Sequence, residues 1–531
     1  MKKNLLILSV VLLLASGCTR QEGSPITSYG AKADGLTNNA TFIQKAIDEV
    51  SAKGGGRVTV PPGIFKTGSL ELKSGVDLHL EQGSCLMGTN STTEYTVKGR
   101  KSLISATDQK NVSISGPGII DGQGQELMLN IFKKLRSGEL KQDSLWLFKR
   151  PEVGRALVLY FQTCTGVKVT GVTLKNASNW VQDYRGCTDV VIDRITVQST
   201  AYWNNDGLDV SDSKNVRITN CFINASDDGI CLKSENPKLL CENIWIDSCT
   251  VRSSANGFKM GTAGTGGFRD IKVRNLTVFD TYRSAIALES VDGGILENID
   301  IQNVIAKNTG NAIFIRLGKR NKSGNTASLK GVYIANVMAD VPLYKPDQGY
   351  PIEGPPDHLR PGEDKMPRRP GHFHIYGHPF LPYNLLPSSI VGLPGHPVQD
   401  VTLENIEITY GGRADKNIAC IPLNKITEIP ENETGYPEFS MWGELPAWGF
   451  YLRHAEGVKM KNVTLNYREA DFRPAFVFDD VLKAEMTDVK ILSASEMPVI
   501  YLNNSREIDW KNLKMPVNEE KGIQHGKMDN N

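Results

Sequence analysis

Three things are missing from this sequence of 531 residues, and each absence narrows what the protein does. Charge of one sign is missing, because the formal net charge is only +1, which is too balanced to suggest a nucleic-acid partner. A membrane-spanning run is missing, since nothing after the amino-terminal segment approaches the ~20 consecutive apolar residues that cross a bilayer. A regular leucine framework is also missing, which argues against a leucine-rich repeat protein. With 40% apolar residues, the chain has the composition of a globular protein with an extensive core.

The amino-terminal segment has the pattern of a bacterial export signal. A basic start at residues 1–3 is followed by an apolar run over 5–14 and then by small residues that end in Cys18. The apolar run is too short to span a bilayer comfortably, and Cys18 stands where a lipoprotein signal places its acylated cysteine. We therefore predict a signal peptide over 1–17, lipidation at Cys18 and a tether over 18–24. The protein would be lipid-anchored in the cell envelope, in the periplasm or at the outer membrane; a cleaved signal without a lipid is the alternative.

A short unit of alternating apolar residues recurs along the chain. Its copies are centred on Val167, Val190, Val216, Ile244 and Ile271, with steps of 23, 26, 28 and 27 residues, and it returns at Val332, Val401 and Val458. Period-two alternation marks strands with one buried face, and the intervening Gly, Asn and Asp mark turns. This spacing predicts an all-β fold over 25–515, a single-stranded right-handed parallel β-helix whose coils stack ~4.8 Å apart. Leucine-rich repeats would need the missing leucine framework, and propeller blades would need roughly 40 residues each.

The pattern also predicts how this coil is bounded. Helical spacing over 39–53, ended by Gly54, predicts a short amphipathic capping helix. Between 341 and 399 the repeat gives way to a Pro- and Gly-rich segment that holds five of the eight histidines. We predict a large loop insertion there, in which packing and ligand contact are commoner roles for histidine than metal binding. Residues 516–531 have the composition of a polar, disordered tail.

The cysteines leave two possibilities open. Eight remain beyond Cys18, an even number that an oxidising compartment would permit to pair. Cys221 and Cys249 occupy the same place in two successive units, so they can instead stack as free thiols inside the coil, which is the interpretation we favour.

Two acidic motifs lie about one coil apart, at 204–209 and 226–234. Asp206 and Asp227 are 21 residues apart, so a coil of this length predicts that acids distant in sequence are stacked in space. Like charges held close together push at least one pKa upward, and a protonated donor and an ionised base then coexist near neutral pH. Glycoside hydrolysis requires such a pair, because one acid protonates the departing oxygen while another carboxylate activates water. An isolated Asp-Asp-Gly is commonly only a turn, but the register with Asp206 and the nearby Lys233 favour a functional site.

The residues around these motifs resemble glycoside hydrolase family 28, the polygalacturonases and their relatives. Tyr29-Gly30-Ala31 with Asp34-Gly35, and Pro61-Pro62-Gly63 with Thr67-Gly68, are similar to the amino-terminal signature of pectinase-type β-helix enzymes, and the acidic motifs look like the family's catalytic centre. The resemblance covers about 25–320. It implies an inverting hydrolase in which Asp228 is the general acid while Asp206 and Asp227 hold and activate water, with ~6.5–9.5 Å between acid and base. It implies neither a metal nor an organic cofactor.

Two departures from the family pattern concern the substrate site. The family's Gly-His-Gly falls on Ala255-Asn256-Gly257, and its Arg-Ile-Lys falls on Ala287-Leu288-Glu289. Asn256 cannot titrate, and the second change removes two cations that grip a galacturonate carboxylate. Lys259, Arg283 and Arg316, on the same and following coils, are candidates to replace that positive charge. The candidate substrate-binding residues are Asn204, Asp209, Lys233, Asn256, Lys259, Arg283, Glu289 and Arg316.

The sequence therefore predicts a hydrolase of pectic or related uronic-acid-containing glycans, with a poly- or oligosaccharide as its partner. Exo action is favoured because the insertion at 341–399 would wall off one end of an otherwise open groove. A polysaccharide lyase on the same fold is an alternative, but it would normally require a calcium cage and a basic Arg or Lys, whereas the cluster here is acid-rich. A non-catalytic glycan-binding β-helix is the third possibility.

Overall fold

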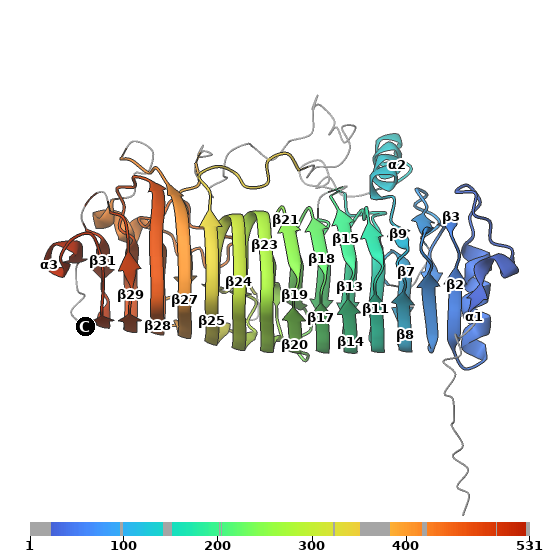
Figure 1. Cartoon of the computed structure of the whole chain (residues 1–531), viewed down its shortest axis with the longest axis horizontal. Helices are drawn as coiled ribbons and strands as arrows, with labels where there is room; N and C mark the ends of the chain where they lie inside the picture. The colour runs from blue at the N-terminus through green and yellow to red at the C-terminus, as the bar shows by residue number, and fades with distance from the viewer. Residues whose placement is uncertain are drawn as a thin grey trace, which may run out of the picture.

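The computed structural model describes residues 23–526 apart from 96–98, 142–150, 201, 203, 322–323, 351–382, 417–421, 495 and 497. The described chain winds into a right-handed parallel β-helix, an elongated stack of coils whose named strands pair in parallel (Figure 1). The predicted fold class is therefore confirmed. No helix in the described part of the chain is long and apolar enough to cross a membrane.

Three ladders of parallel strands run the length of the stack. The first contains β1 (Ser24–Pro25), β2 (Gly56–Val60), β5 (Val76–Leu80), β8 (Lys110–Ser115), β11 (Thr165–Thr170), β14 (Thr188–Asp193), β17 (Lys214–Thr219), β20 (Cys241–Asp247), β23 (Gly267–Ser290), β24 (Ile295–Leu317), β25 (Ser328–Val341), β27 (Val398–Gly412), β28 (Phe450–Glu469), β29 (Phe476–Thr487) and β32 (Arg506–Lys511). The second adds β3 (Gly63–Thr67), β6 (Ser84–Gly88), β9 (Ile119–Asp121), β12 (Thr173–Lys175), β15 (Thr196–Ser199), β18 (Phe222–Ala225), β21 (Thr250–Ser253) and β30 (Lys490–Ile491). The third adds β4 (Leu70–Glu71), β7 (Ser102–Thr107), β10 (Leu157–Gln162), β13 (Gln182–Arg185), β16 (Leu208–Ser211), β19 (Ile230–Ser234), β22 (Phe258–Gly264), β26 (Ser388–Val391), β31 (Ile500–Asn503) and β33 (Ile523–His525). Several of the long strands from β23 onward bend through more than one ladder.

The register follows the repeat that is visible in the sequence. Val167 pairs with Val190, Val190 with Val216, and Val216 with Ile244. The same column continues from Ile244 through Ile271, and later from Val332 to Val401. All of these side chains are buried inside the coil. Alternation therefore fixes the register, because a slip of one residue would turn this apolar column out to solvent.

Stacked asparagines hold one corner of the coil. Asn275, Asn303, Asn336, Asn405 and Asn462 have left-handed backbone conformations, with φ between 51 and 62°. Asparagine is one of the few residues that adopts this conformation readily. The side-chain amide of each donates to a side-chain oxygen on the preceding coil, which satisfies the polar group at every turn.

Helices close or flank the stack (Figure 1). The predicted capping helix is confirmed as α1 (Ala40–Ala52), which buries Ile43, Ala46, Ile47 and Val50. A second helix, α2 (Gly124–Ser137), was not predicted; its apolar face, including Leu127, Met128 and Ile131, is buried while the rest stands out from the coil. The remaining helices are η1 (Ile26–Tyr29), η3 (Leu423–Glu428) and α3 (Glu519–Gly522).

Two predicted boundaries differ from the structure. Within the expected insertion at 341–399, β26 pairs with β24 and β28 and is thus an ordinary rung of the third ladder. The expected polar tail at 516–531 also contributes structure, because β33 pairs with β31 and ends the stack. Ile500, which pairs with Ile523, supplies the buried surface that orders this segment. The signal peptide, Cys18 and the tether up to residue 22 lie outside the described residues, as do His358, His372, His374 and His378.

The prediction of stacked thiols is confirmed. Cys221 and Cys249 are free and buried, and they precede Phe222 and Thr250, which pair on neighbouring coils. Each thiol donates to a backbone carbonyl, Cys221 to Thr219 at 3.2 Å and Cys249 to Asp247 at 3.4 Å. The other described cysteines, Cys85, Cys164, Cys187, Cys231 and Cys241, are free as well.

Candidate active site

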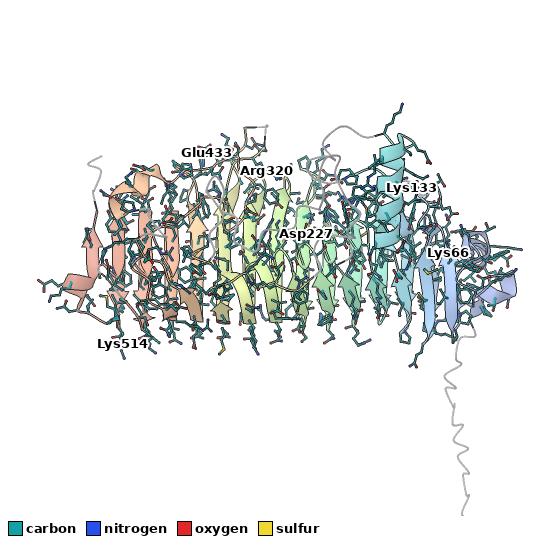
Figure 2. The ribbon with its side chains drawn as sticks, turned by 90° about the horizontal axis from the view of Figure 1, so that it is seen from above. Lys66, Lys133, Asp227, Arg320, Glu433 and Lys514 are labelled. Carbon is teal, nitrogen blue, oxygen red and sulfur yellow. The ribbon has the colours of Figure 1, made fainter. Side chains whose placement is uncertain are left out.

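The acidic residues lie just before successive strands of the third ladder. Leu208 of β16 pairs with Ile230 of β19, and Ile230 pairs with Phe258 of β22. Asp206, Asp228 and Asn256 each precede these strands by two residues and therefore share one column. The level partner of Asp206 is thus Asp228, not Asp227, since the coil is one residue longer than the spacing between Asp206 and Asp227. Asp227 lies midway along the stack, with Arg320 and Glu433 on its carboxyl-terminal side and Lys133 on the other (Figure 2).

Asp206 belongs to a buried ion-pair cluster built around Lys233. The Lys233 ammonium donates to Asp206 Oδ2 at 3.0 Å, to Asp209 Oδ1 at 2.6 Å and to Cys231 Sγ at 2.9 Å. It also lies 4.4 Å from the ring centroid of Trp180. Asn204 Nδ2 donates to the other oxygen of Asp206 at 3.2 Å. One ammonium therefore bridges two buried carboxylates and fixes the orientation of Asp206.

Asp228 belongs to a second buried cluster on the next coils. Its Oδ1 accepts from the backbone N–H of Asn256 at 3.2 Å and from the Asn256 side-chain amide at 2.8 Å. Its Oδ2 accepts from Lys259 Nζ at 3.0 Å. Asn256 thus holds Asp228 in position, and it stands where the pattern of the family that the sequence resembles has histidine. Asp227 is half-buried beside this cluster, and its Oδ1 accepts from the backbone N–H of Asp228 at 3.0 Å.

The two acids of the column have opposite pKa shifts. Burial raises the pKa of Asp206 to about 6, and the charges of Asp227 and Asp228 add to this rise while Lys233 opposes it. Burial would also raise the pKa of Asp228, but Lys259, followed by Lys233 and Arg283, outweighs it and holds that pKa well below its usual range. The pKa values of the two acids are split as expected, but in the free protein it is Asp206, and not Asp228, whose pKa is raised toward neutrality.

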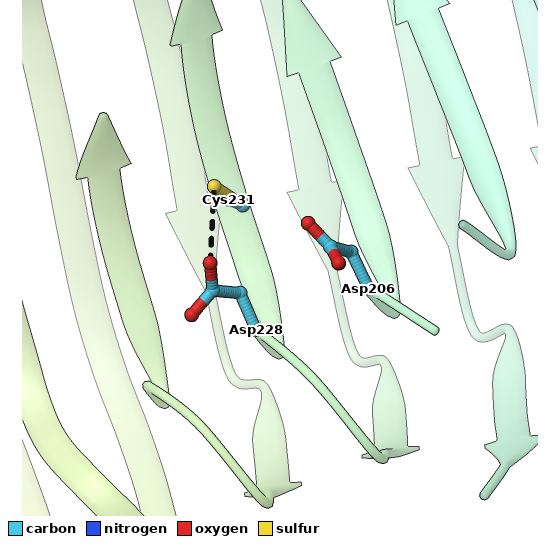
Figure 3. Close-up of side chains that lie close together, drawn as sticks. All are labelled: Asp206, Asp228 and Cys231. Carbon is cyan, nitrogen blue, oxygen red and sulfur yellow. Dashed lines mark hydrogen bonds between the residues drawn. The ribbon is translucent and has the colours of Figure 1, made fainter. Parts of the chain in front are cut away.

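Asp206, Asp228 and Cys231 converge closely (Figure 3). Each offers one ligand-type atom within 4.8 Å of the others. The ~6.5–9.5 Å expected between acid and base is a separation of whole carboxyl groups and stays a prediction. The cluster does not fit a metal ion, because Lys233 and Lys259 already bring two ammonium groups to these atoms. Burial also raises the pKa of Cys231 well above its usual range, so its thiol keeps the proton that a metal would displace.

A segment between the repeats at Val401 and Val458 completes the site. Tyr436 Oη accepts from Lys259 Nζ at 3.3 Å, and Glu438 pairs with Arg283 at 3.1 Å. Glu289 is buried beside Lys259, with 3.7 Å between Glu289 Oε2 and Lys259 Nζ. Burial raises the pKa of Glu289 to about 7, against the opposing charge of Lys259. Tyr436 and Glu438 could not be predicted from periodicity, because their segment has no repeat pattern and reaches the site only through tertiary packing.

Arg316 lies outside this group. Its guanidinium donates to the backbone carbonyls of Gly392 at 2.9 Å and Glu431 at 2.8 Å, and it is fully buried beside the Trp442 ring. These contacts anchor the segment that carries Tyr436 and Glu438. Of the residues predicted from sequence, the structure therefore brings together Asp206, Asp227, Asp228, Asn204, Asp209, Lys233, Asn256, Lys259, Arg283 and Glu289, and it places Arg316 in a supporting position.

A model of one protein family matches more than half of the chain. The family described as "Glycosyl hydrolases family 28" matches residues 51–341, which include the whole column of acids. The chain belongs to this family. The matched region ends before Tyr436 and Glu438, so these two contacts are contributed by a segment outside the family match.

Individual relatives of this family 28 chain are distant in sequence. An exo-poly-alpha-D-galacturonosidase of Dickeya chrysanthemi is 27% identical over 352 residues, which cover 56% of this chain and 58% of that protein. An endo-polygalacturonase of Pectobacterium carotovorum subsp. carotovorum is 26% identical over 348 residues, covering 59% and 83%. The chain thus spans just under three fifths of the length of the Dickeya relative.

Solved structures share the fold. A hyperthermoactive exopolygalacturonase from Thermotoga maritima superposes with a TM-score of 0.57 at 22% identity, covering 84% of this chain and 92% of that one. A family 28 exopolygalacturonase of Yersinia enterocolitica superposes with a TM-score of 0.62 at 18% identity, covering 88% and 78%. These likenesses support the β-helix architecture.

Proposed function

We propose that this family 28 chain is a glycoside hydrolase that cleaves pectic or related uronic-acid-containing glycans. The observation that carries the proposal is the column of Asp206 and Asp228 on adjacent coils, each paired with its own buried ammonium. Acid and base catalysis of glycoside hydrolysis needs two carboxylates with different pKa values, and the pKa values of Asp206 and Asp228 are shifted in opposite directions. The related proteins named above carry exo- and endo-polygalacturonase names, which support the same class of substrate.

In this proposal Asp228 protonates the departing glycosidic oxygen. Asp206 and Asp227 hold a water molecule, and an ionised carboxylate takes its proton as the water attacks the anomeric carbon. The product then has the opposite anomeric configuration to the bond that was cleaved. The chemistry needs neither a metal nor an organic cofactor.

The substrate carboxylate is held by a rebuilt set of cations. Lys259 and Arg283 lie next to Asp228, whereas Ala287 and Glu289 stand where the family resemblance expects two cations. A charge-assisted hydrogen bond contributes roughly 1.5–3 kcal/mol, so moving the cations changes which uronate is held, and where. A carboxylate brought toward Glu289 meets a group with a pKa of about 7, which repels it once ionised.

A wall beside the site supports exo action. The segment that carries Tyr436 and Glu438 lies over Lys259 and Arg283 on the carboxyl-terminal side of the acids. Its Phe439 and Trp442 pack against Tyr282 and Phe314 of the coil in one apolar cluster. Such a wall favours short chains or chain ends over the middle of a polymer. Export and lipidation at Cys18 stay a prediction, which mass spectrometry of the mature amino terminus would check.

The substrate proposal is tested with a panel of short galacturonic-acid oligosaccharides, long homogalacturonan and neutral galacto-oligosaccharides. We expect the short uronic substrates to be cleaved from one end and long unbranched homogalacturonan to be a poor substrate. Rapid mid-chain cleavage of polygalacturonate would show that the rebuilt clamp is irrelevant. Products that absorb in the ultraviolet would indicate a lyase, and binding without turnover across the panel would indicate a glycan-binding protein.

A further inference from the structure

The Lys259 ammonium is shared among three partners with unequal access to solvent. It lies 3.0 Å from Asp228 Oδ2, 3.3 Å from Tyr436 Oη and 3.7 Å from Glu289 Oε2. Asp228 and Glu289 are buried, as is Lys259 itself, whereas Tyr436 is 43% exposed. A ligand that reaches Lys259 therefore arrives from the side of Tyr436.

The two oxygens of Asp228 are not equivalent. Oδ1 accepts both of the hydrogen bonds that Asn256 donates. Oδ2 faces Lys259, and the Cys231 thiol lies farther away, at 4.0 Å. A general acid must carry a proton on the oxygen that it presents to the substrate. The oxygen of Asp228 that has room for this proton is the one that Lys259 occupies, and an ammonium and a carboxylic O–H cannot both donate across the same short contact.

We propose that Lys259 couples the charge of the substrate to the protonation of Asp228: its ammonium pairs with Asp228 in the free protein and moves to the carboxylate of a bound uronate, so that Asp228 Oδ2 takes up one proton from solvent. This inference rests on the proposed function. The charge balances, because the substrate carboxylate replaces the Asp228 carboxylate as the partner of the ammonium, and one proton neutralises Asp228. Asp228 later gives this proton to the departing oxygen. The attacking water loses one proton to the base, so the number of protons balances over the reaction.

The other charged groups around Asp228 do not substitute for Lys259. Lys233 on β19 is held by Asp206, Asp209 and Cys231, and Arg283 on β23 pairs with Glu438. The remaining neighbours, Asp227, Glu289 and Tyr436, bring no positive charge. Among the groups that lower the pKa of Asp228, Lys259 has the largest effect. A uronate that draws this ammonium away therefore leaves burial as the main influence and raises that pKa.

The coupling also gives a reason for substrate selection. A neutral sugar offers nothing that competes with Asp228 for the ammonium, so Asp228 stays ionised and cannot act as the acid. When a uronic sugar binds, Asp228 takes up the proton that it needs to act as the acid. Selection then occurs in the chemical step as well as in binding, and the two contributions separate as effects on kcat and on KM.

Isothermal titration calorimetry measures the proton directly. Galacturonate or glucuronate is titrated into the wild-type protein at pH 5 in two buffers of different ionisation enthalpy, with galactose and glucose as matched neutral ligands. At pH 5 Asp206, with a pKa of about 6, and Glu289, with a pKa of about 7, are already largely protonated. We expect uptake that approaches one proton per uronate bound with at least one of the two uronates, and none with the neutral sugars.

Variants identify the proton acceptor and the coupling residue. Asp228→Asn is expected to bind the uronate without proton uptake, while Glu289→Gln keeps the uptake. Lys259→Gln is expected to lose the uptake, because Asp228 is then protonated before the uronate arrives. It should also lower the ratio of kcat for uronic to kcat for neutral glycosides at least about tenfold, since Asp228 no longer needs a uronate to become the acid.

Several results overturn the inference. They are uronate binding without proton uptake in the wild type, uptake that persists in Asp228→Asn, uptake that is lost only in Glu289→Gln, or no binding of either uronate. The failure of the proposed function is distinct, because it would appear as no turnover of any uronic substrate in the panel. A wild-type protein that cleaves uronic oligosaccharides without proton uptake would contradict only the coupling by Lys259.

Discussion

Replacing Asp228 with Asn is expected to lower kcat by about 10²–10⁴-fold while the protein stays folded. The amide has nearly the same shape and can still accept the hydrogen bonds from Asn256, but it cannot give a proton to the departing oxygen. The loss should appear mainly in kcat, because the variant leaves Lys259 and Arg283 in place to bind the substrate. Steady-state kinetics on an unactivated uronic oligosaccharide measures this effect.

A matched control separates the loss of the acid from the loss of a carboxylate in general. Asp247 lies at the end of β20 on a different ladder, where it accepts from Asn275 Nδ2 at 2.8 Å. Asp247→Asn is expected to keep the wild-type kcat. Near-wild-type kcat in Asp228→Asn, with circular dichroism showing that both variants are folded, would exclude Asp228 as the general acid.

Replacing Lys233 with Met is expected to have the largest effect on stability. The substitution leaves Asp206 and Asp209 buried without their shared ammonium, and removal of one partner from such a pair costs about 3–5 kcal/mol. Burial already raises the pKa of Asp206 to about 6 and that of Asp209 well above its usual range, and losing Lys233 raises both further. The folded variant therefore binds protons more tightly than the unfolded chain, and its deficit in unfolding free energy relative to the wild type shrinks as the pH falls toward about 6, where wild-type Asp206 takes up its proton as well.

Denaturant unfolding at pH 8 and pH 5 tests this expectation. Lys459→Met is the control, because Lys459 forms an exposed ion pair with Glu485, 3.2 Å apart, of a kind that contributes little. We expect a large loss for Lys233→Met at pH 8, a smaller loss at pH 5, and little change for the control at either pH. An equal cost at both pH values would show that the buried carboxylates are not the source of the effect.

Much of the fold could be predicted from the sequence because each coil repeats one local pattern. The column from Val167 to Ile271 sets the register, and the capping helix has its own helical spacing and a glycine stop. The predicted insertion over 341–399 and the predicted tail over 516–531 each contain a strand, β26 and β33, because these short strands are ordered by the coils beside them and not by their own composition. α2 was not predicted because it is a helical insertion in one coil and has no counterpart in the repeating unit of strands and turns.

The site was predictable where it depends on register and unpredictable where it depends on tertiary packing. The repeat length predicts that the second acidic motif lies on the coil next to Asp206. Only the pairing of Leu208 with Ile230 identifies Asp228 as the level partner of Asp206. Tyr436 reaches Lys259 across 177 residues of sequence, and no periodicity connects them. The protonation pattern was also out of reach, because it depends on which ammonium lies nearest to each buried carboxylate.

The stereochemistry of the first-formed product tests the central claim most directly. Proton NMR during hydrolysis of a short galacturonic-acid oligosaccharide resolves the anomeric signals of the new reducing end before they equilibrate. The account predicts that the first-formed anomer is opposite to the bond that was cleaved, because a water held by Asp206 and Asp227 attacks from the far side of the sugar. The test is demanding, because an oxygen of Asp206 and an oxygen of Asp228 lie within 4.8 Å of each other. A retained anomer, or the vinyl proton of an unsaturated product, would contradict the account.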